Sequence, residues 1–355
     1  MTRLLALDGW RRSVIGGLIA ALPVVGVCVL VLLFAPAYVE RLAYAGLVAI
    51  VVVAGLQVFT GNALIVNFGH TVWVALGAYF VAILTTPPAM KALIIPDAPW
   101  GLATLQLHPL PAVVIALFAV LALATLTGLV ISRVSGIGAD ILTLCLQIIV
   151  HSVLIHWTDL FKGNTAFFGV PQFMTLPWAL LIVTVVLVLA RLFRDSPWGV
   201  QLRASSENLL AARSMGVNVA RRRLAAWVLG ALISATAGMM YVFFIGTISA
   251  KSFYFSYVFL TIAMLILGGM RTVSGVVVGT AIIQIGIELI RMLENGPVML
   301  GLQLPQMFGL SGLVLGVVIV LCMVLRPSGV MGTREFDDLL RMWLARRPGR
   351  NGDRP

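Results

Sequence analysis

The sequence predicts an all-α polytopic membrane protein with about ten transmembrane helices. Its mean hydropathy is +1.06, and apolar residues make up 61% of the 355 residues whereas charged residues make up 10%. Soluble domains contain only about half apolar residues and about a quarter charged ones. Apolar runs of near 20 residues also recur along the chain, and about 20 helical residues cross the hydrocarbon core of a bilayer.

We place the spans at residues 13–34, 42–59, 62–85, 111–131, 138–157, 177–193, 225–248, 256–270, 275–293 and 309–326. The third span holds Asn62 and Asn67 between Gly61 and Gly69. Polar residues and glycines in this pattern favour a broken or re-entrant helix, which a membrane tolerates only where it is buried in protein or lines an aqueous cavity. The eighth span ends at Gly268-Gly269, so the eighth and ninth spans are candidates for a second broken pair.

Lysine and arginine predict the orientation, because inner loops of membrane proteins are enriched in them. With the N-terminus inside, 19 of the 24 basic residues fall on the inner side. The outer side keeps Arg41, Lys91, Lys162, Lys251 and Arg291. We therefore expect both termini in the cytoplasm, and the net charge of +11 reflects topology rather than nucleic-acid binding.

The chain divides into a transmembrane domain, residues 1–326, and a basic C-terminal tail, residues 327–355, expected to be disordered or peripheral. The longest loop between two spans on the inner side, 194–224, is polar, and its pattern predicts a short helix. Ser206 is a candidate N-cap, Glu207 suits the first turn, and Gly216 suits a left-handed end. Leu209, Leu210 and Met215 give it an apolar side. Such a helix lies on anionic headgroups or docks a soluble partner.

His70 is the strongest ionisable candidate at membrane depth, because polar residues surround it. We expect Asn62, Asn67, His70 and Thr71 to line a translocation path. The alternative is a structural histidine bonded to a neighbouring backbone carbonyl. Gly69 and Gly77 share one helical face, as do Gly275 and Gly279. We assign all four to helix packing, with the second pair against a partner membrane subunit, because small residues let membrane helices approach closely.

Catalytic chemistry has no sequence signature here. The chain lacks the GxxxxGK[ST] phosphate loop, HExxH and GxSxG. The predicted spans contain no series of acidic residues that would cross the membrane, which argues against a proton-coupled transporter. We expect no catalytic residue, no metal ligand and no cofactor bound by this chain. The chain therefore cannot bind and hydrolyse ATP in the P-loop manner.

The stretch GVQLRASSENLLAARSMGVNVARRRLAAWVLGALISATAGMMYVFFIGTISAKS, residues 199–252, resembles the LivM-type permeases of branched-chain amino acid ABC importers. That family carries a stretch such as G-R-x-L-R-A-I-R-E-N-E-x-A-A-E-A-L-G-I-N-V-x-x-x-K-L. The matching residues here are Gly199, Leu202, Arg203, Ala204, Glu207, Asn208, Ala211, Ala212, Gly216, Asn218, Val219 and Leu224. Ser205, Ser206, Leu209 and Arg213 depart from it, and two of these replace acidic residues.

Two further stretches resemble the same family. GNALIVNFGHTVWVALGAY, residues 61–79, is similar to G-Y-A-G-Q-x-S-x-G-H-x-x-F-x-G-I-G-A-Y, with departures at Leu64, Ile65, Asn67, Trp73 and Ala75. LGGMRTVSGVVVGTAIIQIGIEL, residues 267–289, is similar to L-G-G-x-G-T-x-x-G-P-x-x-G-A, with Arg271 and Val276 departing. Residues 163–171 match a family loop only loosely.

The resemblance implies a permease subunit that carries branched-chain amino acids or related urea, amide or aromatic-acid solutes. It implies that the loop 194–224 is a coupling loop, whose ATPase-coupling residues are Glu207, Asn208, Leu209, Ala211, Ala212 and Gly216. The implied partners are a LivH-like permease, two ABC ATPase subunits and a periplasmic or extracellular solute-binding protein, at the bacterial inner membrane. Two other classes stay open: an ion-coupled secondary transporter or channel with a lipid-binding inner loop, and an intramembrane enzyme that uses His70 or His151.

Overall fold

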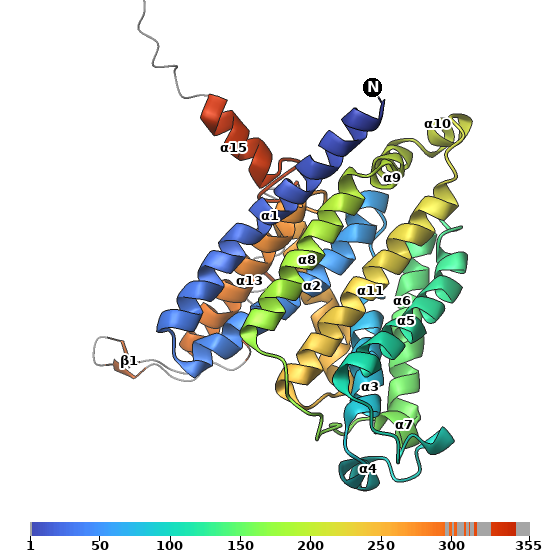
Figure 1. Ribbon diagram of the computed structural model, residues 1–355, viewed down its shortest axis with the longest axis vertical. Coiled ribbons are helices and arrows are strands. Elements are labelled where there is room, and N and C mark those ends of the chain that lie inside the picture. The colour runs from blue at the N-terminus through green and yellow to red at the C-terminus, as the bar shows by residue number, and fades with distance from the viewer. Residues whose placement is uncertain are drawn as a thin grey trace, which may run out of the picture.

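The computed structural model describes residues 2–294, 298–299, 302–303, 309, 312, 316–317 and 328–345. Within these residues, eight segments are long and apolar enough to cross a membrane. They lie in α1 (Thr2–Phe34), α2 (Ala37–Ala63), α5 (Pro109–Ile131), α6 (Ile137–His156), α8 (Leu176–Asp195), α11 (Val219–Ile245), η2 with α12 (Ala250–Phe253 and Phe255–Gly268) and α13 (Val273–Glu294). These helices run side by side as one bundle (Figure 1).

Shorter elements complete the described chain. The apolar helix α3 (His70–Thr85) has 16 residues and lies inside the bundle. The others are α4 (Pro88–Ile94), η1 (Pro99–Gly101), α7 (Thr158–Phe161), α9 (Pro197–Glu207), α10 (Leu209–Ser214), α15 (Phe336–Ala345) and an antiparallel pair of two-residue strands, β1 (Val298–Met299) and β2 (Leu302–Gln303).

The predicted polytopic helical class is confirmed, and nine of the ten predicted spans fall on helices. The third span is broken: Asn62 still belongs to α2, residues 64–69 are non-helical, and α3 begins at His70. The eighth and ninth spans are separate helices, parted at Gly269, whose φ is +120°. The predicted tenth span, 309–326, lies almost wholly outside the described residues.

Proline and glycine set several helix boundaries. Pro36 precedes α2 in an extended conformation, and Pro109 opens α5, where its missing N–H and fixed φ suit the first turn. Gly246 ends α11 with φ +79°, a left-handed conformation that costs glycine little. These boundaries separate the long apolar helices from the connections at the two ends of the bundle.

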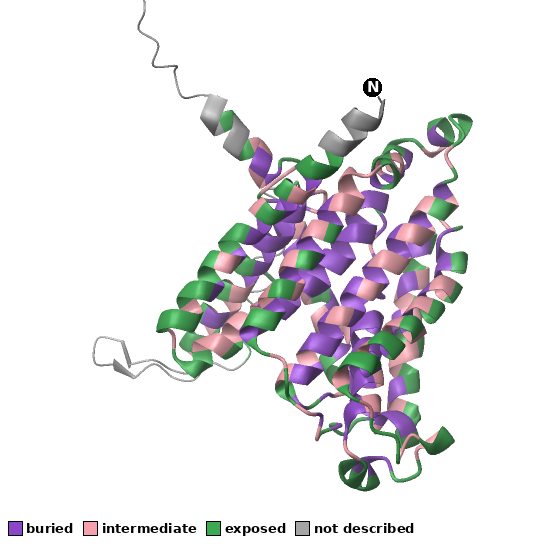
Figure 2. Cartoon of the chain, in the orientation of Figure 1, coloured by how far each residue is buried: buried purple, intermediate pink, exposed green. Residues whose placement is uncertain are grey.

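The core is centred on α2 and α3, whose side chains are buried along most of their length (Figure 2). Helix α11 packs against both of them. The Trp227 ring of α11 meets the edges of Phe59 of α2 and Trp73 of α3, at centroid distances of 5.2 and 6.0 Å. A Cβ at Gly238 of α11 would lie 1.9 Å from the Val74 carbonyl oxygen of α3, so only glycine permits this approach.

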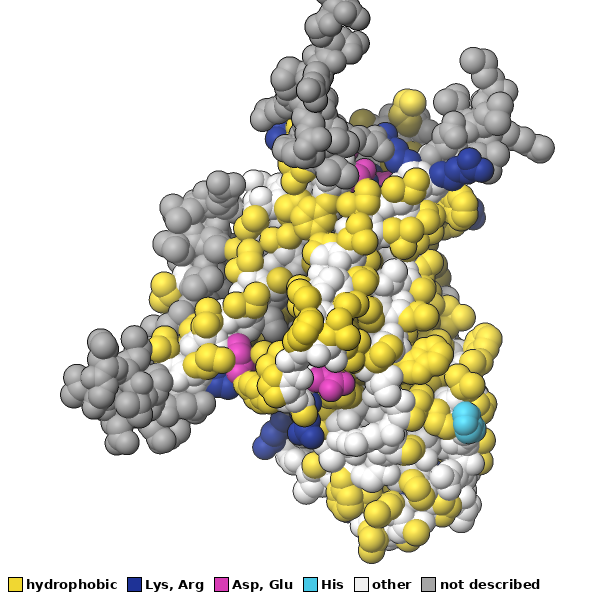
Figure 3. Space-filling model, turned by 60° about the vertical axis from the view of Figure 1, so that its left-hand side comes forward, with side chains coloured by type: hydrophobic (Ala, Val, Ile, Leu, Met, Phe, Trp, Pro, Cys, Tyr) yellow, Lys and Arg dark blue, Asp and Glu magenta, His cyan; other side chains and the backbone are white. Residues whose placement is uncertain are grey.

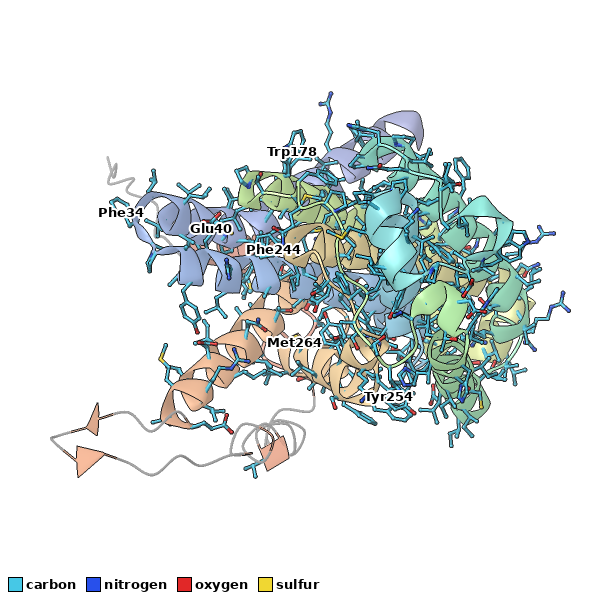
Figure 4. The ribbon with its side chains drawn as sticks, turned by 90° about the horizontal axis from the view of Figure 1, so that it is seen from below. Phe34, Glu40, Trp178, Phe244, Tyr254 and Met264 are labelled. Atoms are coloured by element: carbon cyan, nitrogen blue, oxygen red, sulfur yellow. The ribbon has the colours of Figure 1, made fainter. Side chains whose placement is uncertain are left out.

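Hydrophobic side chains cover the side of the bundle, and charged side chains gather toward its ends (Figure 3). Figure 4 looks onto the end where α1 meets α2 and where α8 begins. Phe34 and Trp178 project at its edge, with exposed fractions of 81% and 60%, whereas Phe244 lies farther inward and stacks on Tyr44. An apolar side wall of this kind is what a bilayer requires of a helical bundle.

The opposite end, which we call the arginine-rich end, carries Arg194, Arg203, Arg223 and Arg271 together with the start of α1. Figure 1 shows α9, α10 and α15 at this end and α4 and α7 at the other. The loops predicted to share the inner side therefore do share one end of the molecule.

The first part of the C-terminal tail differs from the disordered or peripheral segment that we expected. The N–H groups of Val330 and Met331 donate to the carbonyls of Leu267 and Gly268, at 2.8 and 3.0 Å. Farther on, Glu335 and Asp337 are buried, with exposed fractions of 1% and 4%. This segment closes the arginine-rich end of α12 and α13.

Glu335 is held by both backbone and charge. One carboxylate oxygen accepts the Val273 N–H and the other accepts the Ser274 N–H and hydroxyl, at 2.6–2.9 Å. A carboxylate at a helix N-terminus is favoured by the unpaired N–H groups there. Arg191 of α8 forms ion pairs with Glu335 at 2.8 Å and with Asp337 at 3.2 Å. We call Arg191, Arg194, Asp195, Glu335 and Asp337 the C-terminal ionic cluster.

Candidate functional site

The polar loop 194–224 folds into two short helices at the arginine-rich end, α9 and α10; we call residues 197–216 the coupling segment. Asn208 adopts an extended conformation and ends α9. Its side-chain oxygen accepts the Ala211 N–H at 3.0 Å, which caps α10. Gly216 follows α10 with φ +77°. The chain therefore turns twice within ten residues, and α10 protrudes as a short helix separate from α9.

The predicted capping of this segment is wrong in two details. Ser206 does not cap a helix start, because its hydroxyl donates to the Arg203 carbonyl within α9. Glu207 is the last residue of α9 rather than part of a first turn, and it pairs with Arg271 at 2.6 Å. Asn208 takes the capping position instead. Gly216 adopts the left-handed conformation that the sequence predicted.

The two faces of α10 are unequal. Leu210 and the residue that follows α10, Met215, are exposed, at 78% and 83%. Ala211 is also exposed and Leu209 is half-buried, whereas Ala212 is buried against the rest of the chain. Ala212, one of the predicted coupling residues, is therefore covered by this chain itself, and the large exposed apolar side chains of the segment are Leu210 and Met215.

Residues 64–69, the broken segment, connect α2 to α3. Side chains from three sources hold its backbone N–H groups. Thr60 of α2 accepts from Asn67, and Asp140 and Thr143 of α6 accept from Val66 and Phe68, at 3.0–3.2 Å. The Asn67 side chain accepts from Gly69. Non-helical backbone at membrane depth requires such partners.

The predicted path residues lie around this segment, and all four are buried. The His70 ring contacts the Asn67 carbonyl through Nδ1 at 2.8 Å and the Thr261 hydroxyl of α12 through Nε2 at 2.7 Å. Thr71 donates to Gln147 of α6 at 2.9 Å. The structure thus joins Asn67 and His70 by a hydrogen bond and places Thr71 in a separate bond to α6, and the histidine has the backbone bond of the alternative that we left open.

The four predicted packing glycines all lie against backbone. A Cβ would fall 2.8 Å from the Thr143 carbonyl at Gly69 and 2.4 Å from the Ala235 carbonyl at Gly77. At Gly275 and Gly279 it would fall 2.8 and 2.0 Å from carbonyls of Gly268 and Met264. These last contacts are with α12 of the same chain. The pair Gly275/Gly279 is therefore occupied internally, which corrects the expectation of a partner permease there.

Comparison with known proteins decides the family. The family described as "Branched-chain amino acid transport system / permease component" matches residues 37–323. The chain belongs to this family. It is the permease component of an ABC importer. No solved structure matches this permease significantly.

The permease is similar to several named relatives. It is 26% identical over 320 residues to the high-affinity branched-chain amino acid transport system permease protein LivM of Salmonella typhimurium, covering 80% of this chain and 68% of the relative. It is 30% identical to LivM of Escherichia coli, over 45% of this chain and 34% of that one. It is 28% identical to the probable permease LivH of Methanocaldococcus jannaschii, over 43% and 46%.

Sequence reasoning missed two features of the permease. Arg203 belongs to the motif that resembles the family, and the sequence assigns it no role, yet its guanidinium donates a hydrogen bond to the Asn62 side chain. Glu335 stood in a tail expected to be disordered or peripheral, and its only local signal is the acidic run Glu335-Phe336-Asp337-Asp338 within a basic tail. Asn62 lies 141 residues from Arg203, and Val273 and Ser274 lie 62 and 61 residues from Glu335, so no local pattern reveals either contact.

Proposed function

We propose that this permease and a second, LivH-like permease subunit form the pathway of an importer for branched-chain amino acids or related small polar organic solutes. The names of the relatives support this substrate class, since three of them are branched-chain amino acid permeases of bacteria or an archaeon. The permease would lie in the bacterial inner membrane with both termini and the arginine-rich end in the cytoplasm. A solute-binding protein would deliver substrate at the opposite end.

The coupling segment is the observation that carries the proposal. Two exposed apolar side chains, Leu210 and Met215, belong to the short helical segment between Asn208 and Gly216. The Arg271–Glu207 ion pair links the start of this segment to the connection between α12 and α13. We infer that two ABC ATPase subunits, which bind ATP and Mg²⁺, bind the permeases through such segments. This chain itself would bind no cofactor.

Replacing Leu210 and Met215 together with aspartate is expected to abolish retention of the ATPase subunits, because the contact would have to bury two unpaired charges. ATPase co-purification and solute uptake in reconstituted proteoliposomes measure the effect. Leu93→Asp is the matched control, since Leu93 is an exposed leucine of α4 at the other end. Normal co-purification and uptake in the double variant would contradict the proposed docking.

We further propose that the broken segment belongs to the translocation path, with Asn62, Asn67, His70 and Thr71 at its wall when the path opens. Membrane proteins place irregular backbone where it is buried in protein or lines a cavity. In the described conformation His70 bonds to the Asn67 carbonyl and to Thr261 of α12, and Thr71 bonds to Gln147 of α6. Opening would exchange these bonds for contacts with water and solute.

His70→Ala is expected to lower the uptake rate at least tenfold while substrate binding to the solute-binding protein stays unchanged. The Asn67 carbonyl would lose its partner in the closed state, at a cost of about 1–3 kcal/mol. Uptake and thermal unfolding of the purified complex are measured side by side. A variant that unfolds earlier but transports normally once assembled would assign His70 a structural role alone.

A further inference from the structure

Arg203 connects the coupling segment to the end of α2. Its guanidinium NH1 group lies 2.7 Å from the Asn62 side-chain oxygen and 2.7 Å from the Arg194 carbonyl. Asn62 is fully buried and donates its amide to the Val58 carbonyl at 2.9 Å, one turn earlier in α2. The Arg203 side chain of α9 is therefore hydrogen-bonded to α2, the helix that precedes the broken segment.

Arg203 bonds to neutral acceptors, as Arg223 does at the same end of the molecule. Arg191, Arg194 and Arg271 each form an ion pair with a carboxylate. Within the described residues, Arg203 has no carboxylate within ion-pair distance and binds one amide and one backbone carbonyl. Burial lowers the pKa of Arg203 to about 10, so the group remains charged at neutral pH. Neutral acceptors compensate a half-buried charge poorly, so a role in stability alone explains this contact badly.

The backbone of α2 connects Asn62 to the predicted path residues. Thr60, two residues before Asn62, accepts the Asn67 N–H, and the Asn67 carbonyl contacts the ring of His70, which also contacts Thr261 of α12. A shift of Asn62 thus reaches the broken segment within one helical turn. Arg194, whose carbonyl is the second acceptor, also donates to the Arg271 carbonyl beside Glu207. The contact therefore joins the coupling segment to the broken segment by a short, continuous route.

We propose that Arg203 is a positioning residue that transmits movement of the coupling segment, through Asn62, to the broken segment 64–69. The inference rests on the proposed function, because it presupposes an ATPase on the coupling segment. Without Arg203 the ATPase would still dock on Leu210 and Met215 and would still hydrolyse ATP. Its cycle would no longer move the end of α2.

The test uses the full complex in proteoliposomes, with the permeases, ATPase subunits and binding protein. Arg203→Met keeps most of the side-chain length but removes charge and donors, and Asn62→Leu removes the acceptor. Both variants and their double are compared with Arg133→Met, an exposed arginine of the same end. The readouts are ATPase co-purification, ATP hydrolysis and solute moved per ATP.

We expect each single variant to keep the ATPase subunits and to move at least tenfold less solute per ATP. The double variant should be no worse than either single one, because both would break the same contact. Arg203→Lys retains charge but has a single donor centre, so it should lie between wild type and Arg203→Met. If the methionine variant does not assemble, Arg203→Lys and Asn62→Leu decide the question by the same ratio.

A second readout follows the broken segment directly. Leu64→Cys, placed in a background whose native Cys28, Cys145 and Cys322 are serine, reports access of a thiol reagent to this partly exposed position. Labelling should change with ATP and vanadate when Arg203 is present and stay constant in Arg203→Met. Unchanged transport per ATP in Arg203→Met, or losses that multiply in the double variant, would overturn the inference. A wild-type complex that retains no ATPase would instead overturn the proposed function.

Discussion

Glu335→Gln is expected to lower the free energy of unfolding of the permease by about 3–5 kcal/mol, the range for breaking a buried ion pair from one side. The amide would keep one acceptor at the start of α13 but would remove the buried countercharge that Arg191 and Arg194 share, leaving Asp195 and Asp337 for Arg191 and Asp195 for Arg194. Its NH₂ group would also face the N–H groups that the carboxylate now accepts. The loss should appear although the site lies far from the coupling segment in sequence.

Thermal unfolding of the detergent-solubilised permease measures this effect. Asp338→Asn is the control, because the Asp338 side chain is 41% exposed and pairs at 3.6 Å with Arg12, whose side chain is 55% exposed. Exposed pairs contribute about 0–1 kcal/mol, so this variant should unfold like the wild type. Equal unfolding temperatures for Glu335→Gln and Asp338→Asn would show that the C-terminal ionic cluster does not hold the end of the bundle together.

Gly279→Leu is expected to separate α12 from α13 and to prevent stable folding of the isolated permease. A Cβ at this position would lie 2.0 Å from the Met264 carbonyl oxygen and 2.7 Å from the Gly268 backbone nitrogen. Backbone cannot move aside as a flexible side chain can. The cost should therefore exceed the about 1–3 kcal/mol that is typical of overpacked cores.

Gly286→Leu is the matched control on the same helix, because nothing lies within 4 Å of a Cβ there. Yield and monodispersity of the permease expressed without its partners are the measurements. Loss of Gly279→Leu under these conditions places the clash inside this chain. Normal yield of the isolated permease, with a defect only in the assembled complex, would restore a partner helix as the neighbour of Gly279.

The sequence predicts the helices better than it predicts their neighbours. The pair Gly275/Gly279 correctly indicates a close helix approach, yet the pattern contains nothing about which helix approaches. The glycines and asparagines around residues 61–69 indicate the break after α2, because backbone freedom and polar side chains are local properties. The partners that satisfy the break, Asp140 and Thr143, come from a helix that follows more than 70 residues later.

In the coupling segment too, residue types predict one feature, whereas another depends on contacts with distant residues. Gly216 could be identified as a helix stop from residue type alone. The N-cap could not, because Ser206 and Asn208 are both good capping residues two positions apart. The choice depends on where α9 ends, and α9 is fixed by contacts of Arg203 and Glu207 with Asn62 and Arg271.

The C-terminal ionic cluster also imposes an order on biosynthesis. Asp337 is translated 146 residues after Arg191, and Glu335 precedes it by two positions. When α8 first enters the bilayer, Arg191 has only Asp195, four residues on, as a local countercharge. Arg191 and Arg194 therefore lack the carboxylates of Glu335 and Asp337 until the segment after α13 emerges from the ribosome. A nascent permease that stalls before this point has an excess of positive charge at this end, which distinguishes it from the complete chain.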